Sequence, residues 1–228
     1  MPTPEPSSLL HNVEIIHWCA LGAMAVVYTL RIRWLLSFRA TRDRQAPGAP
    51  ARTSAQRGAV YSLGNVLMPW AMESTRKGPL FYLTFVLFHL GVVAGISLAF
   101  LSTISRPFMQ IPAVATATLG LLVAAFAIGL YRIARRVLRR VMRLISTPDD
   151  YFSVTLLTSW FLLGAFAELN ILGRVSGDGV MVAYLLLTSF FLLYVPFSKI
   201  SHYLYYPFTR IWLGRTLGHR GVFPLLRG

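Results

Sequence analysis

Cysteine is almost absent from this sequence of 228 residues, and its scarcity excludes several kinds of site. Because Cys19 is the single cysteine, the chain cannot form an internal disulfide. Nor can it supply the set of thiolates that holds an iron–sulfur cluster. Covalent attachment of haem through a CxxCH motif is excluded for the same reason.

Charged residues are also scarce: they make up 13% of the chain, whereas 55% is hydrophobic. The mean hydropathy of +0.58 is too high for an ordinary soluble domain. A bilayer core about 30 Å thick requires about 20 residues of helix. Five stretches reach that length, and we predict an all-α, polytopic bundle that forms one membrane domain over residues 1–228. The predicted spans cover residues 13–30, 79–101, 111–131, 152–172 and 180–205.

Two segments outside the spans are long: a loop over residues 37–78 and a tail over residues 207–228. The N-terminus lacks the cationic start of a signal peptide and carries acidic residues before the first span. We therefore expect the first span to be retained.

Acidic residues are the scarcest charged class, with 8 Asp and Glu against 22 Lys and Arg, and the formal net charge is +14. Such a charge suits nucleic-acid binding, but the placement of the basic residues indicates a membrane topology instead. Residues 31–78, 132–150 and 199–228 carry 20 of the 22, while the opposite side keeps Arg106 and Arg174. The positive-inside rule then places the N-terminus outside and the C-terminus in the cytoplasm. A bacterial or archaeal cytoplasmic (inner) membrane follows most simply.

A run of six arginines follows the third span with helical spacing. That spacing predicts a single cationic helical face. It has two compatible explanations: binding of lipid headgroups, or docking of an acidic cytoplasmic subunit. The arginines are Arg132, Arg135, Arg136, Arg139, Arg140 and Arg143.

The start of the fourth span reads as a helix N-terminus. Thr147 suits the N-cap, Pro148 suits the first helical position, and Asp149 and Asp150 favour the positive end of the helix dipole. This motif is explained by structure alone.

His89 and His202 each lie within or beside a long apolar stretch, where an ionisable side chain is a candidate functional residue. Their spans are predicted to be antiparallel, so both histidines are expected in the cytoplasmic half of the membrane. Two imidazoles that face each other in a helix bundle suit a low-spin haem b. The alternatives are a structural, hydrogen-bonding His89 and an interfacial His202 within an aromatic belt.

Other residues near the two histidines fit the same haem. Gly91 and Gly95, four residues apart, allow a flat group or a close neighbour to pack against the second span. Lys199, Arg210 and Arg76 are placed by the predicted topology to meet haem propionates.

The second and fifth spans resemble the cytochrome b (gamma) subunit of respiratory nitrate reductase. The family includes the membrane subunits of heterodisulfide reductase and of the sulfite-reductase-associated complex. The matching segments are LFHLG at residues 87–91 and PFSKISH at residues 196–202. Five spans, an outside N-terminus and an inside C-terminus also agree with this family.

The resemblance implies two haems in the family pattern, with two histidines on each of these spans. His89 and His202 match the pair for the cytoplasm-proximal haem, but the distal positions hold Ala99 and Tyr184. Since both members of the distal pair are missing together, we expect one non-covalent haem b.

The family associates quinol oxidation with the distal haem, which this sequence does not support. The remaining polar residues of the outer half are candidates for binding a quinone such as menaquinone, since quinol oxidation requires bases near the leaving protons. Each is also explained by an ordinary structural role near the end of a span. The candidates are Glu14, His17, Glu168 and Tyr184.

The sequence thus predicts a haem b-containing membrane anchor of a respiratory oxidoreductase. It would exchange electrons between a membrane quinone and a cytoplasmic iron–sulfur subunit, because the chain itself has no second redox centre. The alternative is a haem-free structural or transport subunit. The spans contain few charges and no visible inverted repeat, which disfavours a transporter.

Overall fold

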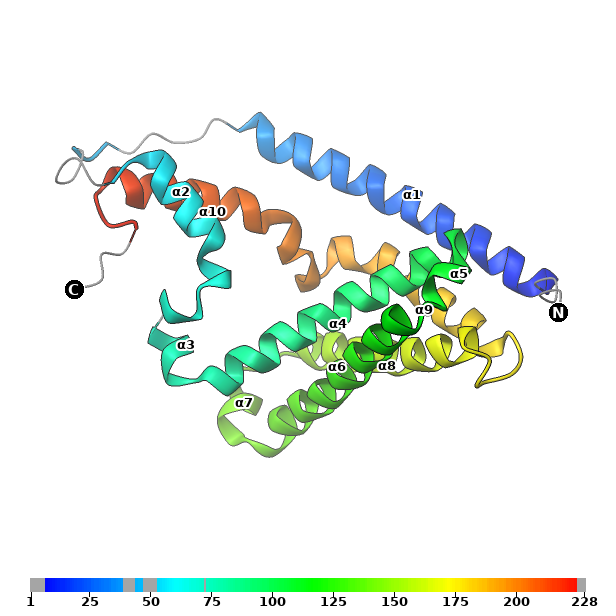
Figure 1. Ribbon diagram of the computed structural model, residues 1–228. Coiled ribbons are helices and arrows are strands. Elements are labelled where there is room, and N and C mark those ends of the chain that lie inside the picture. The colour runs from blue at the N-terminus through cyan, green and yellow to red at the C-terminus, as the bar shows by residue number, and fades with distance from the viewer. Residues whose placement is uncertain (1–6, 39–43, 47–52, 72, 225–228) are drawn as a thin grey trace. The chain divides into compact units, whose positions relative to one another are not determined.

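The fold was analysed in a computed structural model that describes residues 7–38, 44–46, 53–71 and 73–224 (Figure 1). Every regular element in these residues is a helix, which confirms the predicted all-α class. Five helices are long and apolar enough to cross a membrane, as predicted. They are α1 (Ser8–Ser37), α4 (Pro79–Ile104), α6 (Pro112–Leu138), α8 (Pro148–Ile171) and α9 (Gly179–Tyr194), the last extended as a span to Phe197.

Shorter helices connect the long ones. The predicted loop over residues 37–78 contains four short helical elements among its described residues. The predicted tail begins inside a helix of 18 residues, α10. The short elements are α2 (Ala55–Gly64), η1 (Asn65–Leu67), η2 (Pro69–Ala71), α3 (Glu73–Lys77), α5 (Arg106–Met109), α7 (Arg140–Ile145), η3 (Val195–Phe197), η4 (Lys199–Ser201) and α10 (His202–His219).

The long helices differ in how much of their surface is enclosed by protein. Half of the apolar window of α9 is buried, against 17% of that of α1. The buried side of α1 is a single stripe at helical spacing, Leu10, Val13, His17 and Ala20, whereas large apolar residues such as Ile15 are exposed. Apolar side chains that point away from protein are expected to face lipid.

The start of α8 is capped as predicted. The backbone N–H of Thr147 donates to Oδ2 of Asp150 at 2.8 Å, and Pro148 occupies the first turn. This reciprocal arrangement is a capping box, which satisfies backbone groups that the first helical turn leaves unpaired. It fixes the residue at which the fourth span begins.

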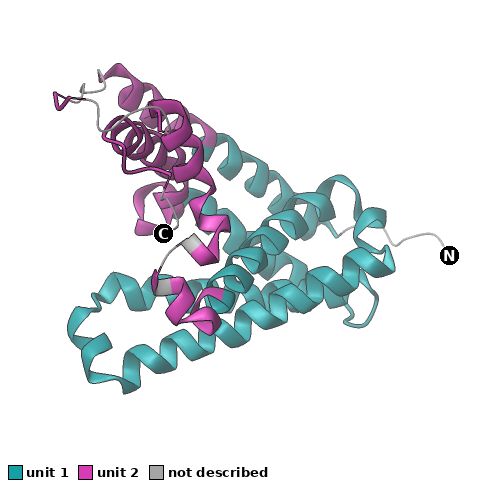
Figure 2. Cartoon of the chain, turned by 60° about the vertical axis from the view of Figure 1, so that its left-hand side comes forward, with its two compact units in different colours: residues 1–24, 83–194 teal, residues 25–82, 195–228 magenta. Residues whose placement is uncertain are grey.

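The chain divides into two compact units, as Figure 2 shows. Unit 1 comprises residues 1–24 and 83–194, and unit 2 comprises residues 25–82 and 195–228.

Close helix packing at glycines holds unit 1 together. A Cβ atom on Gly129 would lie 2.3 Å from Oγ1 of Thr158, so α6 and α8 approach too closely for any side chain there. Trp160 Nε1 donates to Thr188 Oγ1 at 2.8 Å between α8 and α9. Small residues and interhelical hydrogen bonds of this kind drive helix association in lipid, where burial of apolar surface alone gives little advantage.

Unit 2 is organised around the crossing of α2 and α10. A Cβ atom on Gly58 would lie 2.1 Å from the carbonyl oxygen of Gly214, and one on Gly214 would lie 2.4 Å from that of Gly58. The guanidinium Nε of Arg210 donates to the carbonyl of Ser62 at 3.0 Å. The two backbones are therefore in direct contact.

Two predicted helices end earlier than expected. The fifth span was predicted to continue to residue 205, but α9 ends at Tyr194 and two 3-10 turns precede His202. Pro196 lacks an N–H and its ring would clash with the preceding turn of an α-helix. Ser198, in an extended conformation, then caps the next turn by accepting from the backbone N–H of Ile200 at 3.2 Å.

The predicted single face of six arginines is also wrong. Helix α6 ends at Leu138, and Arg139 is extended with φ −93° and ψ 120°. Arg140 and Arg143 therefore belong to a separate short helix, α7, instead of continuing the face that carries Arg132 and Arg136. Helical spacing in a sequence does not reveal a single extended residue that interrupts it.

We expect Gly214→Ala to lower the free energy of unfolding by about 1–3 kcal/mol, because the new methyl group overpacks the α2–α10 crossing. Gly64→Ala is the matched control in the same unit, since its Cβ would lie 3.4 Å from the flexible end of Met68. Thermal and denaturant unfolding in detergent would measure both. Equal stability of the two variants would contradict the close crossing.

Candidate functional site

His89 lies in α4 in unit 1 and is half-buried. Its Nδ1 is 2.8 Å from the carbonyl oxygen of Phe85, one turn earlier. A carbonyl can only accept a hydrogen bond, so Nδ1 carries the proton and Nε2 carries the lone pair of the neutral ring. This is the tautomer in which Nε2 can ligate a metal while the other nitrogen fixes the ring.

His202 is the first residue of α10 in unit 2 and is exposed. Its Nδ1 is 3.1 Å from the carbonyl oxygen of Lys199, in the preceding 3-10 turn. The same argument assigns the proton to Nδ1 and the lone pair to Nε2. The two histidines selected from the sequence therefore share one tautomer, set in each case by a backbone carbonyl of the preceding turn.

Several aromatic side chains lie around the start of α10. The hydroxyl groups of Tyr28 and Tyr203 form a hydrogen bond. The guanidinium of Arg31 lies 5.1 Å from the ring centroid of Phe197 and donates to the hydroxyl of Tyr205 at 3.5 Å. The C-terminal half of α1 is thereby tied to the segment that carries His202.

Arg132 is a residue near His89 that the sequence interpretation treated only as part of the arginine run. Its guanidinium lies 4.1 Å from the ring centroid of Phe88, the neighbour of His89, and its side chain is half-buried. A cation over an aromatic face is stabilised by the ring quadrupole. In the sequence, Arg132 could have been distinguished from the other arginines of the run by its position as the first arginine after an apolar helix.

Gly91 and Gly95 face protein neighbours, which replaces the expectation that they accommodate haem. A Cβ atom on Gly91 would lie 2.2 Å from that of Ala125, and one on Gly95 would lie 2.6 Å from the indole of Trp160. Both glycines serve close packing of α4 against α6 and α8. The spacing of two glycines in a sequence does not distinguish a site for a flat ligand from close packing of a neighbouring helix.

The three cations predicted to meet propionates all lie in unit 2. Lys199 and Arg76 are exposed. Arg210 is half-buried and donates to the Ser62 carbonyl, with its guanidinium 6.0 Å from the ring centroid of Tyr206. Arg210 therefore has a structural role in joining α10 to α2.

Tyr184 links three helices of unit 1. It is fully buried in α9, and its hydroxyl donates to the carbonyl of Gly95 in α4. Its ring packs on α8, where a Cβ atom on Gly164 would lie 3.1 Å from the ring. Because α4 and α8 run in the same direction (Figure 1), Gly95 and Gly164 lie at one level of the bundle.

Glu168 and Ala99 lie one turn beyond that level, about 6 Å further along their helices. They lie toward the end of unit 1 where α8 finishes at Ile171, which we call the outer end. His17 lies beside them, because its ring centroid is 5.2 Å from that of Phe100 in α4. We call Glu168 and His17 the outer layer.

Glu168 and His17 are both fully buried, and among the described residues neither carboxylate oxygen and neither ring nitrogen has a hydrogen-bond partner. Glu14, the fourth quinone candidate, is only half-buried. Buried polar groups are nearly always hydrogen-bonded in folded proteins, because removing them from water without compensation costs several kcal/mol. Two such side chains in one layer are therefore candidates for binding a ligand or water.

The outer end is closed by a network around Asn170. Its amide nitrogen donates to the carbonyls of Val175 and Gly177 at 2.9 and 2.8 Å. Asp178 accepts from the backbone N–H of Ser7 at 3.3 Å, and the hydrogen bonds from Ser7 lower the pKa of this carboxyl group. The polar residues at the rim are thus paired, in contrast to those of the outer layer.

Two further observations concern metals and thiols. No group of three or more His, Cys, Asp or Glu that could hold a metal ion occurs within the described ranges. A haem with two histidine ligands would not form such a group. Cys19 is exposed on α1.

Comparisons with known proteins add one relative. A protein of Nitratidesulfovibrio vulgaris (strain Hildenborough) is 28% identical over 204 residues, which cover 88% of this chain and 86% of the relative. The name of this relative, "Protein", states no activity. No family model matches the chain, and no solved structure matches it. The similarity extends over both units and is not confined to one motif.

We expect Glu168→Met to raise the free energy of unfolding by about 1–3 kcal/mol, because it replaces an unpartnered buried carboxyl group with an apolar side chain of similar size. Asn170→Leu is the matched control in the same helix, and it should destabilise the fold through loss of its hydrogen bonds. Denaturant unfolding in detergent would compare them. A less stable Glu168→Met would mean that the carboxyl group is paired in the folded protein.

Proposed function

We propose that this chain is a haem b-binding subunit of a respiratory complex in the cytoplasmic membrane. It would exchange electrons between a membrane quinone and an iron–sulfur subunit on the cytoplasmic side. The observation that carries the proposal is the common tautomer of His89 and His202, with Nδ1 bonded to a backbone carbonyl in both. The hydrogen bond of Nδ1 orients each ring, and Nε2 is the nitrogen of this tautomer that would form an axial bond.

The residues beside the two histidines fit the rest of such a site. Beside His89, Arg132 offers a cation for a propionate group, and Phe85 and Phe88 give the imidazole an apolar surround. Lys199, three residues before His202, keeps the propionate role expected from the sequence. Haem, when bound, would supply one-electron transfer. The chain itself would orient the imidazoles, exclude water and neutralise the propionates.

The distal positions of the family pattern support a single haem. Ala99 is fully buried and offers no ligand, and Tyr184 uses its hydroxyl to bind the Gly95 carbonyl. The indole of Trp160 fills the space in front of Gly95. Neither distal position therefore offers a side chain for an axial bond.

A pyridine-haemochrome assay on the purified protein should give one haem b per chain. We expect His89→Ala and His202→Ala each to abolish the low-spin absorption spectrum, because each removes one axial nitrogen. His11→Ala is the control, since His11 is exposed near the start of α1. A haem-free wild-type protein would favour the structural alternative, and a low-spin spectrum retained in His89→Ala would refute this ligand pair.

The quinone part of the proposal is supported by the outer layer. Oxidation of a quinol releases two protons and two electrons, and a base near each hydroxyl group assists the proton transfer. Glu168 and His17 are the two buried side chains of this layer whose polar atoms have no partner. A haem held by His89 and His202 would supply the one-electron chemistry that such an oxidation needs.

We expect Glu168→Gln to slow haem reduction by a menaquinol analogue about 100-fold, because it removes a general base. The haem spectrum should stay unchanged, which separates this test from that of the ligands. Glu73→Gln is the control, since Glu73 is an exposed residue of α3 that pairs with Lys77. An unchanged rate of haem reduction in Glu168→Gln would exclude Glu168 from quinol oxidation.

The orientation belongs to the same proposal. The basic residues favour a cytoplasmic location for α2, α3, α7 and α10. A partner with the iron–sulfur clusters is required because this chain has one cysteine. The exposed Arg215 of α10 offers a cation that an acidic partner could recognise.

A further inference from the structure

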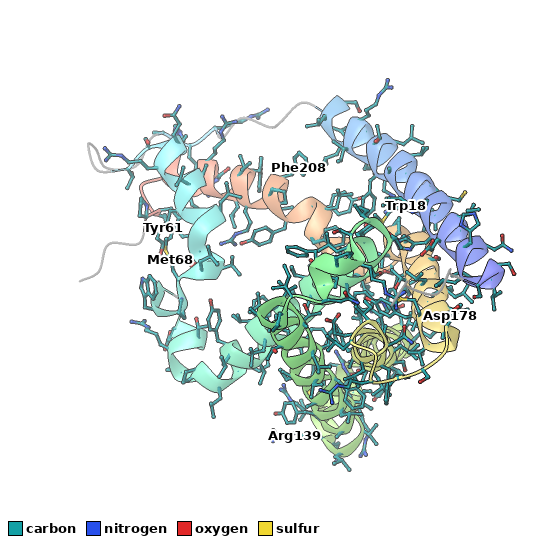
Figure 3. The ribbon with its side chains drawn as sticks, turned by 45° about the vertical axis from the view of Figure 1, so that its right-hand side comes forward. Trp18, Tyr61, Met68, Arg139, Asp178 and Phe208 are labelled. Atoms are coloured by element: carbon teal, nitrogen blue, oxygen red, sulfur yellow. The ribbon has the colours of Figure 1, made fainter. Side chains whose placement is uncertain are left out.

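The connection between α6 and α8 is a short, well-defined turn, residues 138–147, which we call the elbow. It contains α7 flanked by two extended residues, Arg139 and Ser146. Figure 3 shows Arg139 at one end of the unit 1 helices, where α6 gives way to the elbow. The elbow begins at the last residue of α6, a helix that is long and apolar enough to cross a membrane.

The elbow is held by hydrogen bonds among its own residues and the adjoining end of α6. Arg143 NH1 donates to the carbonyl of Val137 at 2.9 Å, which caps the end of α6. Arg136 NH1 donates to Ser146 Oγ at 2.7 Å, and that hydroxyl donates to the carbonyl of Met142 at 2.6 Å. These bonds fold α7 back toward the end of α6 and define its conformation.

The outer surface of the elbow is apolar, the reverse of an ordinary water-facing turn. Leu138, Val141, Leu144 and Ile145 are 77%, 70%, 77% and 68% exposed. The surface continues along α6 through Val137 and Leu130, which are 49% and 48% exposed. A spanning helix exposes such residues to acyl chains, so continuity indicates that the elbow meets the same lipid.

Arg139 and Arg140 add charge at the same place. Both are exposed, and they are adjacent in sequence to Leu138 and Val141. Arginine side chains keep their charged groups at the membrane surface while their stems cover apolar surface. Apolar side chains with two cations at their edge match a lipid that carries acyl chains and an anionic phosphate headgroup.

We propose that the elbow is a binding site for anionic phospholipid, with its apolar residues among the acyl chains and Arg139 and Arg140 on the phosphates. Two observations favour lipid over a protein partner. The apolar surface is continuous with a membrane-spanning helix, and the hydrogen bonds of Arg136 and Arg143 fix the elbow without a partner. This inference does not depend on haem or quinone binding.

The first experiment measures binding of dioleoyl phosphatidylglycerol to the purified full chain in neutral detergent by native mass spectrometry. Each arginine near an anionic membrane surface contributes about fivefold in affinity, so we expect Arg139→Gln/Arg140→Gln to bind about twentyfold more weakly. Arg33→Gln/Arg215→Gln removes the same charge from exposed positions in α1 and α10 and should bind nearly as well as the wild type. Phosphatidylcholine binding should be similar in all three proteins.

Two outcomes of that experiment would overturn the proposal. If the elbow variant binds phosphatidylglycerol as the wild type does, the two arginines do not contact it. If the control variant loses as much affinity, only the net charge matters. Equal melting temperatures of the variants would show that the differences in lipid binding do not arise from unfolding.

The second experiment tests the depth of the elbow in vesicles of phosphatidylcholine and phosphatidylglycerol. A fluorophore on Cys19→Ala/Leu144→Cys should be protected from iodide in the aqueous phase, and one on Cys19→Ala/Arg215→Cys should be quenched. Equal quenching would place the elbow in water and refute the proposal. Protection in native membranes but not in these vesicles would assign the surface to a protein partner instead.

Discussion

The hydrogen bond from the Tyr184 hydroxyl to the Gly95 carbonyl sets the level at which α4, α8 and α9 meet in unit 1. The phenol ring packs on Gly164 at the same time, so one buried side chain fixes both neighbours. Gly95 also packs against the indole ring of Trp160, whose Nε1 donates to the hydroxyl of Thr188 on α9. The placement of Glu168, one turn further on α8, follows from this arrangement.

That packed region contrasts with the layer beyond it. Around Tyr184 the polar groups are paired, whereas His17 and Glu168 keep unpartnered polar atoms at full burial. A sequence selected for stability alone would hold apolar residues at such positions, as the stripe of Leu10, Val13 and Ala20 on α1 does. In unit 1 this departure from good packing chemistry coincides with the residues that the proposed quinone chemistry would use.

Much of the fold was predictable because hydropathy and helix length report directly on a bilayer of fixed thickness. The five spans were found this way, and Thr147 marked the start of α8 through the chemistry of an N-cap. The ends of α6 and α9 were not found. No residue type at Arg139 indicates that its backbone is extended. Pro196 does indicate a helix end, but the apolar stretch continues past it, so the span was predicted to continue as well.

The candidate site was less predictable, because the identity of a residue does not specify its neighbours. His89 and His202 were selected by position, but the tautomer they share depends on backbone carbonyls. Gly91 and Gly95 were assigned to a ligand, and the structure assigns them to Ala125 and Trp160. Arg132 was missed because its aromatic contact lies on another helix.

The exposed thiol of Cys19 has a practical consequence. It is the sole cysteine in the sequence, and it lies on α1, the long helix least enclosed by protein. A maleimide reagent would therefore modify the natural chain at a single atom, without mutagenesis. Labelled in this way, the protein carries a defined spectroscopic reporter on α1, from which distances in the membrane can be measured.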